Sequence, residues 1–248
     1  MKSILFCTSY IKDQQAWDSR YQRWLDYYQN GPIKALKKIM IDDGSPFLPS
    51  HKIIKTIPVN MPLTPNEDEK LIIRFDDNLG RKSTSDYPGW WRSFLHSISI
   101  ANELDADKII HIESDAYILT PRLADYINEI KSGWHVLWSP HYQFPETAIQ
   151  VICRDQFDIF GQIKTDYPNF TFPDIAEKVL PFTNINREFK GDRYSEFQRN
   201  RWIFRSRKFN RFQIFNTNFF LVEIPPDADF VTQIVSRQQV EFKRNQKT

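Results

Sequence analysis

The sequence predicts an α/β domain in which a mainly parallel sheet is flanked by helices. Short apolar runs that end in small or acidic residues alternate with segments of helical periodicity, which is the βαβ pattern. The 248 residues suffice for one large domain with a substantial core. Aromatic residues make up 15% of the chain and there are only 7 Gly, which argues against a low-complexity or disordered chain.

The first strand and helix are expected near the N-terminus. Residues 3–10 are an apolar run with a small polar end, as in a buried parallel strand that opens into a loop. Aromatic residues at 17, 21 and 28 then recur at helical spacing. The Asn-Gly-Pro sequence at 30–32 supplies a C-cap and a breaker, so the helix is predicted to end there.

Two further strands and a helix are expected next. Residues 38–46 are a strand running into a turn, and residues 53–58 are a third strand before a polar loop. Residues 85–88 supply cap residues and an early Pro, and the apolar positions from 91 to 101 form one stripe of a helix.

The remaining elements continue the alternation. Residues 108–116 are predicted as a strand that ends in acids, and a helix begins at Thr120 and Pro121 and ends at Gly133. We also expect strands at 134–138, 147–153 and 215–222, a short helix at 173–180, and a surface helix that frays into a tail over 229–247.

Charge and cysteine usage bound the function. The formal net charge of +2 gives no overall case for a nucleic-acid partner, although residues 187–211 hold nine Lys and Arg against three acids. Cys7 and Cys153 are too few for a disulfide scaffold and fit a reducing compartment. No apolar run approaches the roughly 20 residues that span a bilayer. The expected compartment is therefore the cytoplasm, and any work at a membrane would be peripheral, at its inner face.

Polar residues follow three of the predicted strands. These strand ends are residues 8–10, residues 42–45 and residues 113–115. Ligands of open α/β sheets bind beyond the carboxyl ends of the strands, so a binding site is expected where these residues meet. Acids at such positions can also merely cap a strand or a turn, as Asp42 and Asp43 would in a type I turn with Gly44 at positive φ.

Two of these motifs resemble those of the GT-A glycosyltransferases. In that family a strand ending in Asp-Asp-Gly-Ser lies beside the nucleoside, and a later strand, directly after a helix, ends in Asp-x-Asp. Here the motifs read Asp-Asp-Gly-Ser at 42–45 and Glu-Ser-Asp at 113–115, in the same order. The resemblance covers residues 3–140 and departs from the family in having Glu at position 113.

The resemblance implies a GT-A-like, Rossmann-type fold with a mixed, mainly parallel sheet. It also implies a hexosyltransferase-like enzyme that moves a sugar from a nucleotide-diphosphate sugar to a hydroxyl of a glycan or glycolipid, as in polysaccharide biosynthesis. A UDP-sugar donor and inversion are favoured. The whole chain, 1–248, would be one domain. It would have a nucleotide-sugar-binding half at 1–140, an acceptor-side half at 141–225, and a C-terminal helix and tail at 226–248.

The resemblance further implies a divalent cation, Mn²⁺ or Mg²⁺. A departing diphosphate builds up negative charge, which such a cation neutralises while it takes only one or two protein carboxylates. Glu113 and Asp115 would point to the same side of a strand, because its side chains alternate with a period of two. Asp115 would be the metal ligand, and Glu113 would lie nearer the ribose or a water of the metal shell.

The donor side is expected to include residues from several segments. Asp43 would bind the base or ribose, with Thr8 and Tyr10 on the other wall. Gly80 would allow close backbone approach, and Arg81 or Arg92 would donate to phosphate or base. The predicted donor-binding residues are Thr8, Tyr10, Asp43, Gly80, Arg81, Arg92, Glu113 and Ser114.

An inverting transfer needs a base for the acceptor proton, usually Asp or Glu. The candidates are Glu146, Asp192 and Glu196, and the Gly-Asp-Arg sequence in an aromatic-rich loop favours Asp192. His111 is expected in the core rather than at a metal, whereas sequence order cannot choose between His135 and His141 as a late ligand.

Two other functions were weighed. A sugar nucleotidyltransferase would have a Gly-rich loop after the first strand, and the loop at 8–13 has no Gly. A non-enzymatic polyanion-binding protein would use the basic and aromatic segment at 197–212 and would show steep salt dependence without a metal requirement.

Overall fold

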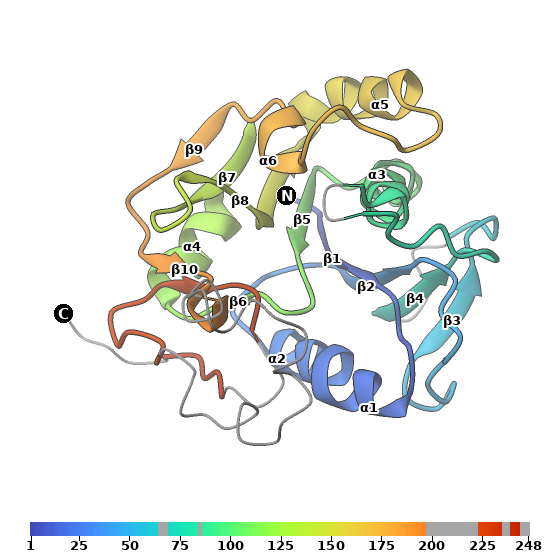
Figure 1. Cartoon of the computed structure of the whole chain (residues 1–248), viewed down its shortest axis with the longest axis horizontal. Coiled ribbons are helices and arrows are strands. Elements are labelled where there is room, and N and C mark those ends of the chain that lie inside the picture. The colour runs from blue at the N-terminus through green and yellow to red at the C-terminus, as the bar shows by residue number, and fades with distance from the viewer. Residues whose placement is uncertain (64–68, 84–85, 197–222, 235–238, 244–248) are drawn as a thin grey trace.

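The computed structural model describes residues 1–63, 69–83, 86–196, 223–234 and 239–243. At its centre is an eight-stranded sheet with the order β3-β4-β2-β1-β5-β8-β7-β9 (Figure 1). The five strands from β3 to β5 in this order are parallel to one another, whereas β8 is antiparallel to both of its neighbours, β5 and β7. The predicted mixed, mainly parallel α/β sheet is therefore confirmed. The strands are β1 (Ser3–Ser9), β2 (Lys37–Asp42), β3 (Lys55–Pro58), β4 (Lys70–Arg74), β5 (Lys108–Ile112), β7 (Trp134–Ser139), β8 (Phe144–Cys153) and β9 (Asn184–Asn186).

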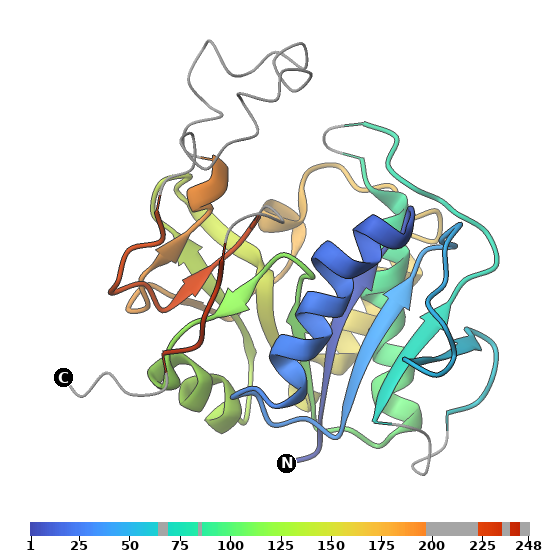
Figure 2. The ribbon, with the colours of Figure 1, turned by 90° about the horizontal axis from the view of Figure 1, so that it is seen from below.

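Helices cover both faces of this sheet (Figures 1 and 2). On one face, α1 (Gln14–Ala16), the π-helix η1 (Trp17–Gln22) and α2 (Arg23–Gln29) follow one another without a break. On the other face lie α3 (Pro88–Glu103) and α5 (Phe157–Asp166). The remaining helices are α4 (Pro121–Glu129), α6 (Ala176–Val179) and the 3₁₀ turns η2 (Arg154–Gln156) and η3 (Tyr194–Glu196).

Alternation along the central strand divides the core into two layers. Ile4 and Phe6 of β1 pack in the cluster that contains the apolar side chains of α3, whereas Leu5 and Cys7 pack in the cluster beneath α2. A strand sends successive side chains to opposite faces, so a continuous apolar run is what a strand buried on both faces requires. The apolar run near the N-terminus of the sequence meets this requirement.

A second, three-stranded sheet joins distant parts of the chain. Its order is β10-β11-β6, with β10 at Gly191–Asp192, β11 at Phe230–Val231 and β6 at Tyr117–Ile118. The backbone N–H of Ile234 also donates to the carbonyl of Asp115 at 3.0 Å. The C-terminal part of the chain therefore supports the segment that follows β5.

Most expected elements form, with shifts at their ends. The strands expected at 134–138 and 147–153 are β7 and part of β8, and the helix expected at 173–180 is the single turn α6. Strand β4 and helix α5 were not predicted. The strand expected at 215–222 lies outside the described residues.

The surface helix predicted over 229–247 is wrong at its described start, because β11 and irregular chain occupy residues 230–234 instead. Phe230 and Val231 are fully buried between two strands, and such pairing outweighs a weak helical pattern. No helix within the described residues combines the length and apolar character required to cross a bilayer.

Candidate functional site

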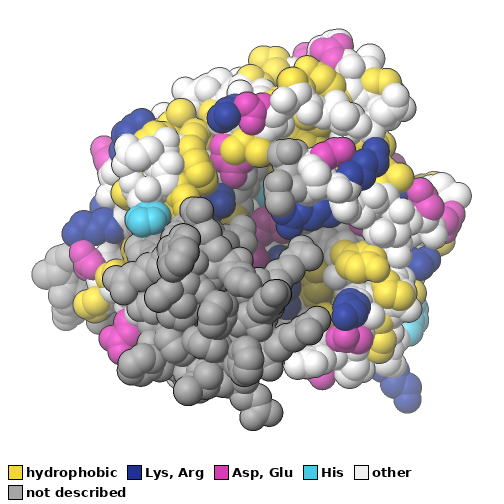
Figure 3. Space-filling view, in the orientation of Figure 1, with side chains coloured by type: hydrophobic (Ala, Val, Ile, Leu, Met, Phe, Trp, Pro, Cys, Tyr) yellow, Lys and Arg dark blue, Asp and Glu magenta, His cyan; other side chains and the backbone are white. Residues whose placement is uncertain are grey.

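One pocket of about 860 Å³ lies beyond the carboxyl ends of β1, β2 and β5. Asp43, which follows β2, and Asp115, which follows β5, both line it. Figure 3 shows acidic and basic side chains in a hollow at the middle of this face of the molecule. The three polar strand ends predicted from the sequence therefore meet at one cavity. Of the predicted residues, Thr8, Tyr10, Asp43, Gly80, Arg81, Glu113, Asp115 and Glu146 line it.

The carboxylate of Glu113 is surrounded by donors of this chain. Thr8 Oγ1 donates to it, 2.9 Å from each oxygen, and Trp90 Nε1 donates to Oε1. Nε2 of His111 lies 3.0 Å from the same oxygen. Burial opposes ionisation of Glu113, but its pKa is lowered because His111, Trp90 and Arg20 stabilise the anion. Glu113 is therefore an anion held by the protein itself.

His111 lies in the core, as expected. It is fully buried and stacks on Phe6 with ring centroids 4.7 Å apart. Its contact with Glu113 fixes that carboxylate from below the pocket floor. His135 contacts Tyr126 and the carbonyl of Ser132 instead.

Asp115 has a cationic partner from near the N-terminus of the chain. Nη2 of Arg20 lies 3.0 Å from Oδ2 of Asp115, and Nε of Arg20 donates to Ser114 Oγ at 2.6 Å. Burial raises the pKa of Asp115, and Glu113 and Glu146 raise it further, while Arg20 lowers it. Sequence reasoning missed Arg20. The signal available was its spacing, one helical turn from both Trp17 and Trp24 on the stripe that faces the sheet.

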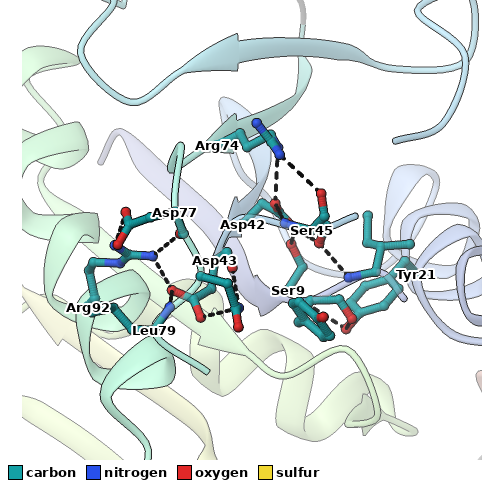
Figure 4. Close-up of polar contacts among 12 residues, drawn as sticks. Ser9, Tyr21, Asp42, Asp43, Ser45, Arg74, Asp77, Leu79 and Arg92 are labelled. Carbon is teal, nitrogen blue, oxygen red and sulfur yellow. Dashed lines mark hydrogen bonds and ion pairs between the residues drawn. The ribbon is translucent and has the colours of Figure 1, made fainter. Parts of the chain in front are cut away.

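Asp43 organises the loop that follows β4. Its Oδ2 accepts from Gly80 N and Asn78 Nδ2, both at 2.8 Å, and its Oδ1 pairs with Arg92 (Figure 4). Gly80 adopts a φ of 61°, and a Cβ on Gly89 would lie 2.0 Å from Asp43 Oδ2. This close approach requires glycine at position 89.

Arg92 was expected to donate to the nucleotide, and the structure places it behind the pocket instead. Its side chain is 8% exposed and pairs with Asp43 and Asp77 (Figure 4). Arg81 lines the pocket, but its guanidinium lies over the Tyr87 ring, 4.5 Å from the centroid, and Nε donates to Ser83 O. Tyr10 is 46% exposed at the pocket wall.

Another part of the pocket lining is built from Glu146, Glu177 and Arg193. Arg193 Nε donates to Glu146 Oε2 at 2.7 Å, and its Nη2 lies 3.1 Å from Glu177 Oε1. Glu146 is fully buried and also accepts from Thr232 Oγ1 at 3.0 Å. Glu177 and Arg193 were not predicted, because neither follows a strand end in a recognisable motif.

Asp192, the favoured base, does not line the pocket. It is 3% exposed, and its carboxylate accepts from Ser139 Oγ, the backbone N–H of His141 and the backbone N–H of Arg193, at 2.7 to 2.8 Å. A general base must come within hydrogen-bond reach of the acceptor hydroxyl. The surroundings of Asp192 suit an anchor of the loop that carries Arg193.

The donor set does not fit the expected divalent cation. Such a cation needs carboxylate oxygens that are available for coordination. Glu113 already accepts from three side chains, and Asp115 is paired with Arg20.

Comparison with known proteins adds little at this site. No family model matches the chain, and no curated protein matches it. Fourteen chains of known structure match. One is a glycosyltransferase involved in the glycosylation of the major capsid of PBCV-1, at 10% identity and a TM-score of 0.42, covering 94% of this chain and 93% of that chain. A likeness at this level carries no argument about the reaction, so the function has to be argued from the pocket.

Proposed function

We propose that this protein is a glycosyltransferase that moves a sugar from a nucleotide-diphosphate sugar, with a UDP-sugar favoured, to a hydroxyl of a glycan or glycolipid. The observation that carries the proposal is the convergence of Asp43 and Asp115 on one pocket at the carboxyl edge of a parallel sheet. That edge is where α/β sheets bind nucleotides.

The wall formed by Tyr10, Asp43 and Gly80 suits the nucleoside. Tyr10 offers an exposed ring for stacking, and Gly80 has no side chain to keep a base or ribose at a distance. Asp43 holds Gly80 by its backbone N–H, so this wall is preorganised before a ligand arrives.

The acids of the opposite wall suit the acceptor. Both described contacts of the Glu177 carboxylate, from Thr147 Oγ1 at 3.2 Å and Arg193 Nη2 at 3.1 Å, are made by Oε1. Glu146, in contrast, uses both oxygens to bind Arg193. We therefore assign the base to Glu177 in place of Asp192.

In the proposed step, the acceptor oxygen attacks the anomeric carbon of the donor and forms the new glycosidic bond. The bond from that carbon to the β-phosphate oxygen breaks, and the electron pair leaves with the nucleoside diphosphate. Glu177 takes the proton of the acceptor hydroxyl. Because the acceptor oxygen attacks from the face opposite the departing phosphate, this single displacement inverts the anomeric centre.

A thermal-shift panel tests the proposal. UDP-, GDP- and dTDP-sugars are each added with Mn²⁺ and with EDTA, and the corresponding nucleosides, without phosphate or sugar, serve as controls. A ligand present at about 100 times its Kd stabilises the native state by about 2.7 kcal/mol, so Tm should rise by several degrees for the matching donor. If no donor raises Tm, and polyanions bind with steep salt dependence, the protein is a polyanion-binding protein instead.

A further inference from the structure

We propose that Arg20 binds the diphosphate of the donor and supplies the positive charge there, so that donor binding needs no divalent cation. The inference rests on the proposed function and extends it to one residue. The acidic segment that follows β5 does not fit a metal site, because the cationic group that contacts Asp115 is a side chain of the protein itself.

The charges of the pocket single out Arg20. Among the described residues, five carboxylates and three guanidinium groups line the pocket, so a diphosphate would be repelled there unless a cation met it directly. Arg193 is held between two glutamates, and Arg81 lies over Tyr87. Arg20 is the pocket-lining arginine whose guanidinium contacts the segment that follows β5. The pocket acids are Asp43, Glu113, Asp115, Glu146 and Glu177.

The guanidinium of Arg20 is oriented but not enclosed. Nε donates to Ser114 Oγ and Nη2 pairs with Asp115, so two edges of the planar group are fixed. Neither of these contacts uses Nη1, and 43% of the side chain is exposed. Arginine offers five N–H donors in a rigid fork that matches phosphate oxygens, which allows it to hold an acid and a phosphate together.

The helix that carries Arg20 is anchored at the edge of the pocket. Tyr21 OH donates to the carbonyl of Tyr10 at 2.9 Å and accepts from the backbone N–H of Tyr10 at 3.0 Å. Trp17 and Trp24 are buried on either side of Arg20. Arg20 lies within the π-helical stretch Trp17–Gln22, and π-turns are frequent at functional sites.

Calorimetric titration with UDP, in EDTA and in Mn²⁺, tests the inference. GDP and dTDP are used in the same way if the thermal-shift panel selects them. The wild-type protein should bind in EDTA with an affinity within about 3-fold of that in Mn²⁺. Arg20→Gln should weaken binding about 10- to 100-fold, the range of a lost charge-assisted hydrogen bond, and Arg20→Lys should lie between. Lys12→Gln removes an exposed charge outside the pocket and should behave as wild type.

Two further measurements guard against misreading. If Arg20→Gln leaves Asp115 unpaired and unfolds the protein, Arg20→Gln combined with Asp115→Asn removes both charges; this double variant should fold, as judged by circular dichroism, and should still bind weakly. Titration with Mn²⁺ alone should show no binding to the wild-type protein.

The opposite results are equally clear. Diphosphate binding that appears only with Mn²⁺, or wild-type affinity in the folded Arg20→Gln or double variant, would overturn the role of Arg20 but leave the proposed function standing. Failure of the wild-type protein to bind any of the three nucleoside diphosphates, with or without Mn²⁺, would remove both.

Discussion

Carboxylates of the same pocket have different properties because their partners differ. Glu113 accepts from Thr8, Trp90 and His111, and its pKa is lowered. Asp115 has one cationic partner and is near two other acids, and its pKa is raised, mainly by burial. At the scale of single residues, charge in this pocket is therefore set by neighbours from distant parts of the sequence.

The first residue-scale prediction concerns the base. Glu177→Gln keeps a carbonyl oxygen for Arg193 but cannot take a proton, so turnover should fall about 10²- to 10⁴-fold while donor affinity stays within about 3-fold. Asp174→Asn is the matched control, because Asp174 lies three residues earlier and does not line the pocket. Steady-state kinetics and calorimetry measure the two quantities. Normal turnover in Glu177→Gln would move the base elsewhere, with Glu146 next to be tested.

A second residue-scale prediction concerns Gly89. In Gly89→Ala, the new Cβ would lie 2.0 Å from Asp43 Oδ2 and 2.9 Å from Gly80 N, so the loop has to shift. We expect a loss of about 1–3 kcal/mol in the free energy of unfolding, together with weaker donor binding. Gly161→Ala in α5 is the control, since nothing lies within 4 Å of its Cβ, and it should stabilise by about 0.5–1 kcal/mol. Urea unfolding distinguishes them, and equal stability of the two variants would contradict the close packing at Gly89.

At the scale of elements, the contact between α3 and α5 contains two ionisable groups whose charged forms are disfavoured by burial. His96 of α3 packs edge-on against Phe75, and burial together with nearby Lys164 lowers its pKa to about 4. Lys164 of α5 donates to Ser99 Oγ, and burial lowers its pKa as well. The packing of these helices therefore favours a neutral His96.

Acid should accordingly weaken this contact. The unfolded chain takes up a proton on His96 below pH 6.5, its ordinary pKa, whereas the folded protein does so only near pH 4. Stability present above pH 6.5 is thus lost between pH 6.5 and 4, by at most about 3 kcal/mol. Urea unfolding of the wild type and His96→Leu at pH 7, 5.5 and 4.5 should show the wild type losing more stability. Parallel losses in the two proteins would exclude this role of His96.

At the scale of the whole molecule, the small sheet connects three distant segments to the pocket. It pairs residues of β6, β10 and β11, and close to β11 Thr232 donates to Glu146 while Gln233 lines the cavity. Phe230 is fully buried there, and a Cβ on Gly191 would lie 2.4 Å from its ring. The stability of the chain and the geometry of the pocket around Glu146 therefore depend on the same residues.

Phe230→Ala tests this dependence. Deleting a buried aromatic ring should cost about 3–5 kcal/mol of unfolding free energy. Ile185→Ala, at a side chain 41% exposed in β9, should cost less than about 1 kcal/mol. Thermal and denaturant unfolding provide the comparison. A loss below about 1 kcal/mol in Phe230→Ala would show that the small sheet contributes little to global stability.

The parallel sheet and the position of the pocket could be predicted from sequence patterns alone. Apolar runs such as residues 3–9 can only be buried on both faces, and the carboxyl ends of parallel strands meet at one edge, so Asp43 and Asp115 had to come together there. These features follow from local periodicity and from a general property of sheets.

The side chains that contact those acids could not be predicted in this way, because they are brought together by the packing of distant segments. The contact of Arg20 with Ser114 spans 94 residues, and that of Arg193 with Glu146 spans 47. Such pairings depend on the register of helices, including the π-helix at Trp17–Gln22, and on how loops pack. Local sequence patterns do not encode these, and for the same reason the motif at 113–115 did not reveal the arginine that pairs with Asp115.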